Sequence, residues 1–387
     1  MVTMTHKARI LAAAEKQSVD KLPFGARIDL WYNYHSTNDT IPRKYRGYTE
    51  IDILRDLGAG GTIVLGSEQV RTSNNRQARI ITLWETTFRN VKVLINEEGP
   101  IKAVTYVTPK GSISTKTEFN RTEGYLQGYV VERLFKNEED YPAIEYLMED
   151  SVLIPDYAEY IRLADLIAGD GVIRCGLRTS PMQYIMRDLM GYEAFFYELA
   201  DHPQKVEHLY EIAKELWKKK LAILANSPAR LLSICSNWSD EIHTPVFRKY
   251  FTPWLQEATE FLHSKGKLTL IHSDGEMRRL IPLVLESGID VAEAWSPTPM
   301  TSITTVKLRE AWGDRITIWG GLPTLIFGPT YSDGKFEDYV INLFREVAPG
   351  NNFIVGMGDN FPIDGDINRI QRVVELIDQY GILPIEI

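Results

Sequence analysis

The chain is poor in cysteine, with only Cys175 and Cys235 among its 387 residues. Two cysteines cannot build a disulfide framework or a cysteine-rich metal site. The sequence also lacks any run of about 18 apolar residues, so no transmembrane helix is expected. Its first residues, MVTMTHKARILAAAEK, lack the apolar core of a signal peptide. These absences predict a cytoplasmic protein in a reducing compartment.

An excess of basic charge is absent as well. The formal net charge is −9 at pH 7, which argues against nucleic acid or an anionic membrane as a partner. With 44% hydrophobic and 25% charged residues, the composition is that of an ordinary globular protein. We expect a single barrel domain over residues 1–387, because a barrel with insertions can reach this length. Composition leaves the oligomeric state open, with a homodimer as one option.

What the sequence does contain is a series of short apolar strands separated by helical patterns. The expected strands are 27–30, 62–65, 171–176, 231–236, 268–272, 289–293, 316–320 and 353–357. Most are continuous apolar runs, which is typical of parallel strands that are buried on both faces. Eight such units predict an α/β fold of the TIM type, a (β/α)8 barrel.

The N-terminal third departs from this pattern. Residues 78–131 alternate apolar with polar residues, as an antiparallel meander with one exposed face does. Residues 138–167 have a largely helical pattern. We therefore expect an insertion over residues 67–165, made of a β meander plus helices, that covers one edge or mouth of the barrel.

The rest of the chain is organised around the stretch Lys267–Trp295. It reads as a strand, a polar turn, a helix over 277–286 and a second strand. The first strand ends on His272 and Asp274, and the second on Glu293. Active sites of parallel barrels lie at the carboxyl ends of their strands. This stretch therefore predicts ionisable groups in a barrel mouth.

Other expected strands also end on polar or aromatic residues, and a closed barrel would gather them at one mouth. The candidates for catalysis are His272, Asp274, Glu241, Glu293 and Asp359. The candidates for substrate binding are Arg27, Asp29, Trp31, Tyr32, Asn33, Arg178, Trp238 and Trp295. The aromatic side chains among them could sandwich an aromatic ring. Alternatively, Trp31 and Tyr32 only hold an aromatic loop against the barrel, and Arg178 only pairs with a carboxylate of the mouth.

Three segments carry a resemblance to a known family. They are HSDGEMRRLIPLVLESGIDVAEAW (272–295), LREAWGDRITIWGGL (308–322) and APGNNFI (348–354). Together they resemble the C-terminal half of the uroporphyrinogen decarboxylase superfamily, which includes corrinoid-dependent methyltransferases. The resemblance implies a barrel that binds a small methylated substrate and works with a separate corrinoid protein, because no Asp-x-His-x-x-Gly corrinoid motif is present.

The methyltransferase branch of that family binds zinc through a His-x-Cys pair and a later cysteine. His272 matches the histidine, but Asp274 stands at the first cysteine position and no cysteine occurs near Met357–Asp359. A set made of His272, Asp274 and Glu293, with Glu241 or Asp359 as alternatives to Glu293, is expected to hold a metal such as zinc instead. The alternative is that His272 and Asp274 hydrogen-bond each other and cap the next helix.

The loss of thiolate ligands favours one reaction within the resemblance. Transfer of a methyl group from an ether requires stabilisation of a leaving oxygen, which a Lewis-acid metal or a proton donor supplies. We therefore expect a corrinoid-dependent methyltransferase of the O-demethylase type acting on an aryl methyl ether, with cobalamin supplied by the partner.

Two other functions remain open at this point. One is a metal-dependent decarboxylase or lyase acting on a small acid, and the other is a non-catalytic relative. Tetrapyrrole decarboxylation itself is not expected, because the family's Arg-Gln-Ala-Gly-Arg segment is reduced here to Arg27 with Asp29 nearby.

Overall fold

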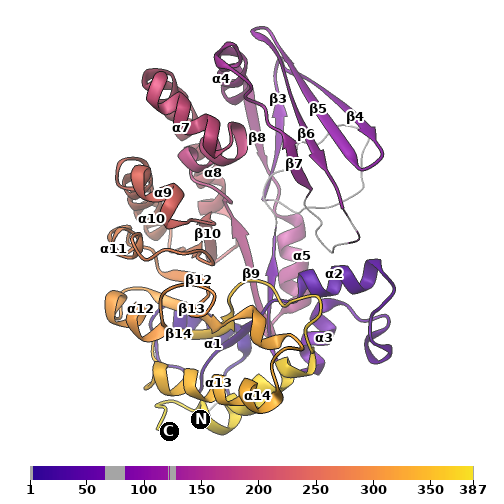
Figure 1. The fold of residues 1–387 in the computed structure, drawn as a ribbon, viewed down its shortest axis with the longest axis vertical. Coiled ribbons are helices and arrows are strands. Elements are labelled where there is room, and N and C mark those ends of the chain that lie inside the picture. Colours follow the sequence, from indigo (N-terminus) through magenta and orange to yellow (C-terminus); the bar gives the residue numbers. More distant parts are fainter. Residues whose placement is uncertain (1–2, 66–82, 121, 123–127, 387) are drawn as a thin grey trace.

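A computed structural model describes residues 3–65, 83–120, 122 and 128–386. Eight parallel strands close into a barrel in the order β1-β14-β13-β12-β11-β10-β9-β2. They are β1 (Phe24–Ala26), β2 (Gly60–Val64), β9 (Gly171–Gly176), β10 (Leu231–Ser236), β11 (Leu268–His272), β12 (Val291–Trp295), β13 (Thr317–Leu322) and β14 (Phe353–Met357). The predicted (β/α)8 barrel is confirmed, and helices alternate with its strands around the outside (Figure 1).

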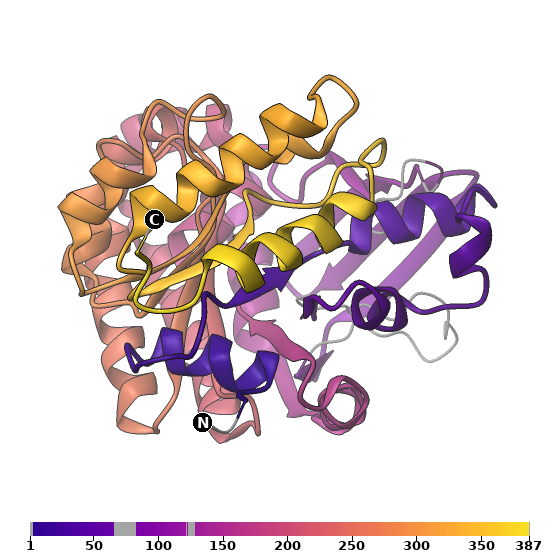
Figure 2. The ribbon, with the colours of Figure 1, turned by 90° about the horizontal axis from the view of Figure 1, so that it is seen from below.

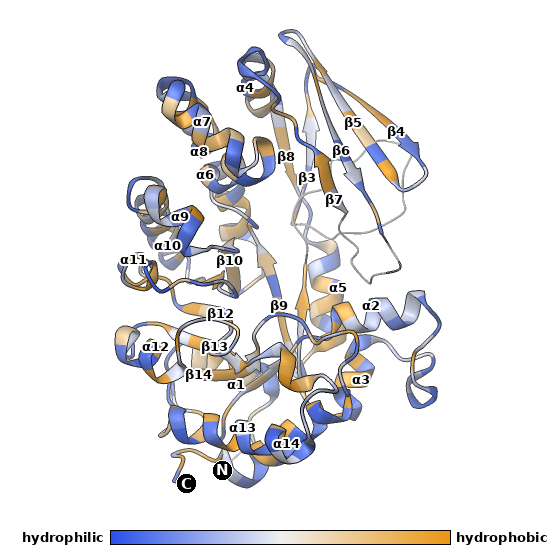
Figure 3. Cartoon of the chain, in the orientation of Figure 1, coloured by the Kyte–Doolittle hydropathy of each residue, from blue (hydrophilic) through white to orange (hydrophobic). Residues whose placement is uncertain are grey.

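The helices that follow the strands bury one face against the barrel, and hydrophobic residues concentrate between the two layers (Figure 3). The α-helices are α1 (His6–Ala14), α2 (Asp29–Thr37), α3 (Glu50–Asp56), α4 (Tyr141–Asp150), α5 (Ala158–Ile167), α6 (Pro181–Gln183), α7 (Tyr192–Asp201), α8 (Pro203–Asn226), α9 (Asp240–Val246), α10 (Thr252–Ser264), α11 (Ile281–Glu286), α12 (Thr305–Trp312), α13 (Asp333–Val347) and α14 (Asn368–Tyr380). Three short 3₁₀ helices of the described residues are η1 (Arg43–Tyr45), η3 (Glu138–Asp140) and η6 (Thr324–Phe327). Two π-helical segments are η4 (Tyr184–Leu189) and η5 (Phe247–Phe251). Figure 2 shows α13 and α14 side by side.

Two antiparallel sheets lie between β2 and β9 in the chain, in agreement with the predicted meander. One pairs β3 (Trp84–Phe88) with β8 (Ser151–Pro155), and the other has the order β4-β5-β6-β7. The strands of the second sheet are β4 (Lys92–Glu98), β5 (Ile101–Thr108), β6 (Gly111–Glu118) and β7 (Tyr129–Glu132). They extend away from the barrel at the upper right of Figure 1. Residues 67–82 of the expected insertion lie outside the described residues.

The amino-terminal end of the barrel is closed by α1. Ile10, Ala13 and Ala14 are buried in one cluster with residues of the barrel interior, including Leu231 and Trp319. The Thr317 hydroxyl donates a hydrogen bond to the carbonyl oxygen of Ala13 at 2.9 Å. Solvent access is therefore expected at the opposite, carboxyl end.

Four local predictions were wrong. The first strand is Phe24–Ala26 and not 27–30 as expected. Helix α2 begins at Asp29 and includes the residues that were expected to form an aromatic loop after that strand. An aspartate in the first turn favours a helix there, because it interacts with the partial positive charge of the helix end. The helix expected over 277–286 begins only at Ile281, and the strand expected over 289–293 is Val291–Trp295.

The fourth difference lies in residues 138–167. They were expected to be helical, but β8 separates α4 from α5. Its sequence, SVLIP, pairs with β3, so a tertiary contact decides its conformation. Across the described part of the chain, every helix is too short or too polar to cross a lipid bilayer.

Candidate active site at the carboxyl end of the barrel

The strand register brings His272 and Glu293 together. They are paired positions of the neighbouring strands β11 and β12. The Nδ1 atom of His272 lies 2.7 Å from a Glu293 carboxylate oxygen. Both side chains are almost completely buried. This contact fixes the orientation of the imidazole ring and leaves its second nitrogen, Nε2, for other partners.

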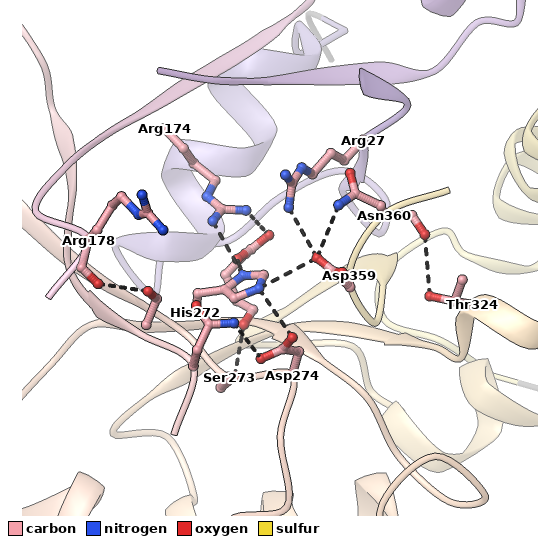
Figure 4. A network of polar contacts seen from close by, with 12 residues as sticks. Arg27, Arg174, Arg178, His272, Ser273, Asp274, Thr324, Asp359 and Asn360 are labelled. Atoms are coloured by element: carbon pink, nitrogen blue, oxygen red, sulfur yellow. Dashed lines mark hydrogen bonds and ion pairs between the residues drawn. The ribbon is translucent and has the colours of Figure 1, made fainter. Parts of the chain in front are cut away.

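Two further carboxylates face that second nitrogen. Asp274 Oδ2 lies 3.6 Å and Asp359 Oδ1 lies 3.5 Å from Nε2 of His272 (Figure 4). One ligand atom from each of the three residues can be chosen so that all lie within 4.8 Å of one another. A nitrogen and two carboxylate oxygens converging on one point are a donor set that zinc accepts. The residues present therefore fit a metal ion.

The structure changes the role expected for Glu293. We had placed it among the metal ligands, but its carboxylate contacts the other nitrogen of His272 and also pairs with Arg174. A carboxylate on the far nitrogen of a metal-binding histidine orients the ring and strengthens it as a ligand. Asp359, one of the alternatives from the sequence, takes the position of the third ligand.

Arginine side chains balance the buried negative charge. Arg174 donates a hydrogen bond to Glu293, and Arg27 contacts Asp29 at 2.8 Å and Asp359 at 3.2 Å. Burial alone would raise the pKa of Glu293, but Arg174 and His272 together lower it. The Glu293 carboxylate is therefore ionised at neutral pH.

The electrostatics of His272 follow from these neighbours. Burial disfavours its charged form, but Glu293 and Asp274 outweigh burial and raise the His272 pKa to about 9. Burial also raises the pKa of Asp359, whereas the hydrogen bond to His272 outweighs burial at Asp274 and lowers its pKa. When no metal replaces it, a proton is therefore held on Nε2 of His272 at neutral pH.

Irregular backbone at the strand ends places these groups. The register of β12 against β13 shifts between Glu293 and Trp295, and Ala294 has a positive φ of 62°. Asn237, which follows β10, has a φ of 58° and lies 3.5 Å from Asp274 through its amide nitrogen. Positive φ is uncommon for residues other than glycine, and bulges often occur beside active sites.

The remaining candidates from the sequence divide into two groups. Arg27, Asp29 and Arg178 lie at the mouth, and Figure 4 shows Arg27 and Arg178 on two sides of the His272 group. Glu241 is exposed on α9, and no hydrogen bond or ion pair within the described ranges joins it to His272. Its predicted catalytic role therefore has no support in the geometry.

The aromatic candidates are mostly core residues. Trp238 and Trp295 are 1% and 0% exposed, and Trp238 packs edge-on against Phe247. Their burial gives no support to the predicted aromatic sandwich, which stays a prediction. Large aromatic rings at strand ends pack into the core whenever helices cover them, and the sequence does not reveal that cover.

The expected aromatic loop is the first part of α2 instead. Trp31 is 2% exposed and lies 4.6 Å from the ring of His35. The Tyr32 hydroxyl donates to the carbonyl oxygen of Tyr48 at 3.0 Å, and Asn33 is half-buried. This agrees with the alternative that Trp31 and Tyr32 hold the segment against the barrel.

One charged residue near the mouth was missed. Glu50 begins α3, is half-buried and interacts with Asp29 and Arg27. Burial, reinforced by Asp29, raises the Glu50 pKa to about 7. It follows no strand, so nothing in the strand-end pattern could have found it.

Comparisons with known proteins agree with this architecture. The family described as uroporphyrinogen decarboxylase (URO-D) matches residues 115–380. No curated protein sequence matches significantly. A solved methyltransferase from Methanosarcina mazei is similar with a TM-score of 0.60 and 14% identity, over 97% of this chain and 99% of that one.

A second solved structure is the spore cortex-lytic enzyme SleL of Bacillus megaterium QM B1551. Its TM-score is 0.34 with 10% identity, over 58% of this chain and 63% of that one. A score this low supports no argument about function.

Proposed function

This chain belongs to the uroporphyrinogen decarboxylase family. We propose that, within this family, it transfers a methyl group from a small methylated compound to the cobalt of a separate corrinoid protein. The preferred donor is an aryl methyl ether. The likeness to a methyltransferase over nearly the whole chain is one support. The observation that carries the proposal is the donor set of His272, Asp274 and Asp359, which contains no thiolate.

A donor set without thiolates suits removal of a methyl group from an ether oxygen better than methylation of a thiol. When a methyl group leaves an ether, the oxygen keeps the bonding electrons and becomes negatively charged. A metal ion held by His272, Asp274 and Asp359 would supply Lewis-acid stabilisation of that oxygen. In the alternative route, His272 donates the proton that it holds on Nε2.

The surrounding residues keep this group in place in both routes. Glu293 fixes the ring of His272, and Arg174 keeps Glu293 ionised. Arg27 contacts Asp359 and limits how far that carboxylate can turn. Side chains held by such contacts lose little freedom when substrate binds, which favours reaction.

The test combines the purified chain with methoxylated aromatic compounds and a corrinoid protein reduced to cobalt(I). Free phenol and methylcobalamin should form in equal amounts, and His272→Ala should lower the rate by about 100-fold or more. Zinc analysis of the purified chain separates the two routes. Release of carbon dioxide from a small acid without methyl transfer would instead identify a decarboxylase.

A further inference from the structure

The four-stranded sheet of the insertion has two edge strands, β4 and β7, and they differ in length and regularity. β7 has four residues, and its register against β6 shifts between Lys116 and Thr117. Short edge strands and bulges are two features that prevent a sheet from pairing with another chain. β4 has seven residues, and its register against β5 is continuous from Lys92 to Glu98. Neither feature therefore protects β4.

Only one side of β4 pairs with a strand of the described part of the chain. That strand is β5, and Figure 1 shows β4 at the outer edge of the sheet. The start of β4 is fixed, because the Asp150 carboxylate accepts hydrogen bonds from the backbone amides of Asn90 at 2.7 Å and Val91 at 3.0 Å. The outer side of β4 is therefore a regular edge that can bind one more strand through backbone hydrogen bonds.

The two ends of β4 carry opposite charges. Lys92 and Glu98 are both exposed, and their side chains form no ion pair or hydrogen bond with another described residue. The neighbouring Glu97 differs, because it pairs with Lys102 of β5 at 3.9 Å. Lys92 and Glu98 are an even number of residues apart, so their side chains point to the same face of the sheet. Both charges are therefore available to a partner on that face.

A second copy of β4 supplies the complementary charges. If two copies run antiparallel about a two-fold axis at Ile95, all seven residues pair, and Lys92 of each copy lies opposite Glu98 of the other. A shift of the axis by one residue in either direction shortens the paired segment and separates Lys92 from Glu98. Opposite charges at facing positions stabilise an antiparallel pair. The register that uses the whole strand is therefore also the register that matches the charges.

The apolar residues of β4 fit the same register. Ile95 is half-buried and would lie on the axis, directly opposite Ile95 of the other copy. Leu94 is 45% exposed, and it would lie diagonally across from Leu94 of the other copy. Direct and diagonal neighbours of an antiparallel pair are close enough for such side chains to contact each other. Pairing would therefore cover apolar surface that the single chain leaves exposed.

We propose that this chain forms a two-fold symmetric homodimer in which the two β4 strands pair and join the two sheets into one. Both copies then use the same surface, as a two-fold axis requires. The interface is small, so the dimer should dissociate on dilution in the range of about 1–100 µM. The proposal is independent of the proposed methyl transfer, because it involves none of the residues of the candidate active site.

Sedimentation velocity of the purified full chain, between about 1 and about 200 µM, measures the dimer directly. The wild type should pass from monomer to dimer as its concentration rises. Lys92→Glu should weaken the dimer by about ten-fold or more, because two attractive pairs become two repulsive pairs. Glu98→Lys should weaken it to a similar extent, because lysines then face each other at both positions.

A mixture of the two single variants tests the register. In a dimer of one Lys92→Glu copy with one Glu98→Lys copy, each glutamate lies opposite a lysine, so the equimolar mixture should dimerise about as tightly as the wild type. The double variant Lys92→Glu/Glu98→Lys should do so by itself. Lys335→Glu changes the net charge by the same amount at an exposed position on α13, and it should leave the dissociation constant unchanged.

Three results would overturn the proposal. They are a wild-type chain that stays monomeric over the whole concentration range, a dimer that Lys92→Glu does not weaken, and a mixture of the single variants that dimerises no more tightly than either variant alone. Circular dichroism of each variant shows that it is folded. Recovery of the dimer in the mixture cannot result from a folding defect, because each variant would bring its own defect to the mixture.

Discussion

At the scale of single residues, the site depends on which nitrogen of His272 each acid contacts. Glu293 occupies Nδ1, and Asp274 and Asp359 lie near Nε2. Sequence reasoning identified all of these residues, but it could not divide them between the two sides of one ring. The division follows from the pairing of β11 with β12 and from the close approach of the segment after β14.

The first prediction concerns Glu293. At the proposed metal site, Glu293→Gln should weaken the binding of added zinc by about 10- to 100-fold, because the ring of His272 loses its orienting carboxylate. Zinc affinity is measured by competition with a chelator, on protein shown to be folded by circular dichroism. Glu241→Gln is the matched control, because that acid is exposed and no hydrogen bond or ion pair among the described residues joins it to His272. Equal zinc affinity in wild type and Glu293→Gln would contradict the positioning role.

The second prediction concerns His243, which is fully buried on α9. Burial lowers its pKa from 6.5 to about 4. The unfolded chain therefore binds a proton below pH 6.5 that the folded chain takes up only near pH 4. The contribution of His243 to the free energy of unfolding is fully present above the pKa of the unfolded chain. It decreases as the pH falls, by about 2 kcal/mol between about pH 7 and about pH 5.

This pH dependence can be isolated with His243→Asn. Its loss of unfolding free energy between pH 7 and pH 5, measured by urea denaturation, should be smaller than that of the wild type by about 2 kcal/mol. His208→Asn changes an exposed histidine and should keep the dependence of the wild type. An unchanged loss in His243→Asn would show that the buried ring does not cause the effect.

At the scale of elements, the barrel interior depends on small residues around one large ring. Trp319 of β13 is 2% exposed and lies against Gly356 of β14. A Cβ added to Gly356 would lie 2.6 Å from the Trp319 ring. The apolar pattern predicted these strands, but only the closed barrel shows why a glycine is needed at that position.

The third prediction follows from this contact. Gly356→Ala should lower the free energy of unfolding by about 1–3 kcal/mol, because the added methyl group overpacks the interior. Gly334→Ala provides the comparison, because its Cβ would meet nothing within 4 Å on helix α13. Because Gly334 lies in the first turn of α13, that variant should be as stable as the wild type or more stable by less than about 1 kcal/mol. Equal urea midpoints for the two variants would exclude the overpacking.

At the scale of the whole molecule, a helix closes one end of the barrel, and the candidate active site lies at the other end. Helix α1 packs across the amino-terminal ends of the strands, and Ile10 is completely buried there. The charged residues of the site lie in the last residues of the strands or just after them, at the opposite end: His272 in β11, Glu293 in β12, and Asp359 after β14. This arrangement separates the residues that stabilise the barrel from those available for chemistry.

The fourth prediction tests the closed end. Ile10→Ala should destabilise the protein by about 2–5 kcal/mol, because it removes buried methyl groups and leaves a cavity. Ile161→Ala on α5, where the side chain is 49% exposed, should change stability by less than about 0.5 kcal/mol. Both are measured by urea denaturation, and zinc affinity should stay the same in each. A large loss of zinc affinity in Ile10→Ala would show that the two ends are coupled.

The sequence by itself determined the barrel, the antiparallel meander and the histidine with acids at the strand ends. It did so because alternation of apolar strands with helices, and polar residues at the ends of those strands, are local patterns. Only the tertiary structure decided that Trp238 and Trp295 are core and that Asp359 rather than Glu293 faces Nε2 of His272. Burial and hydrogen-bond partners depend on segments far apart in the chain, and no local pattern records them.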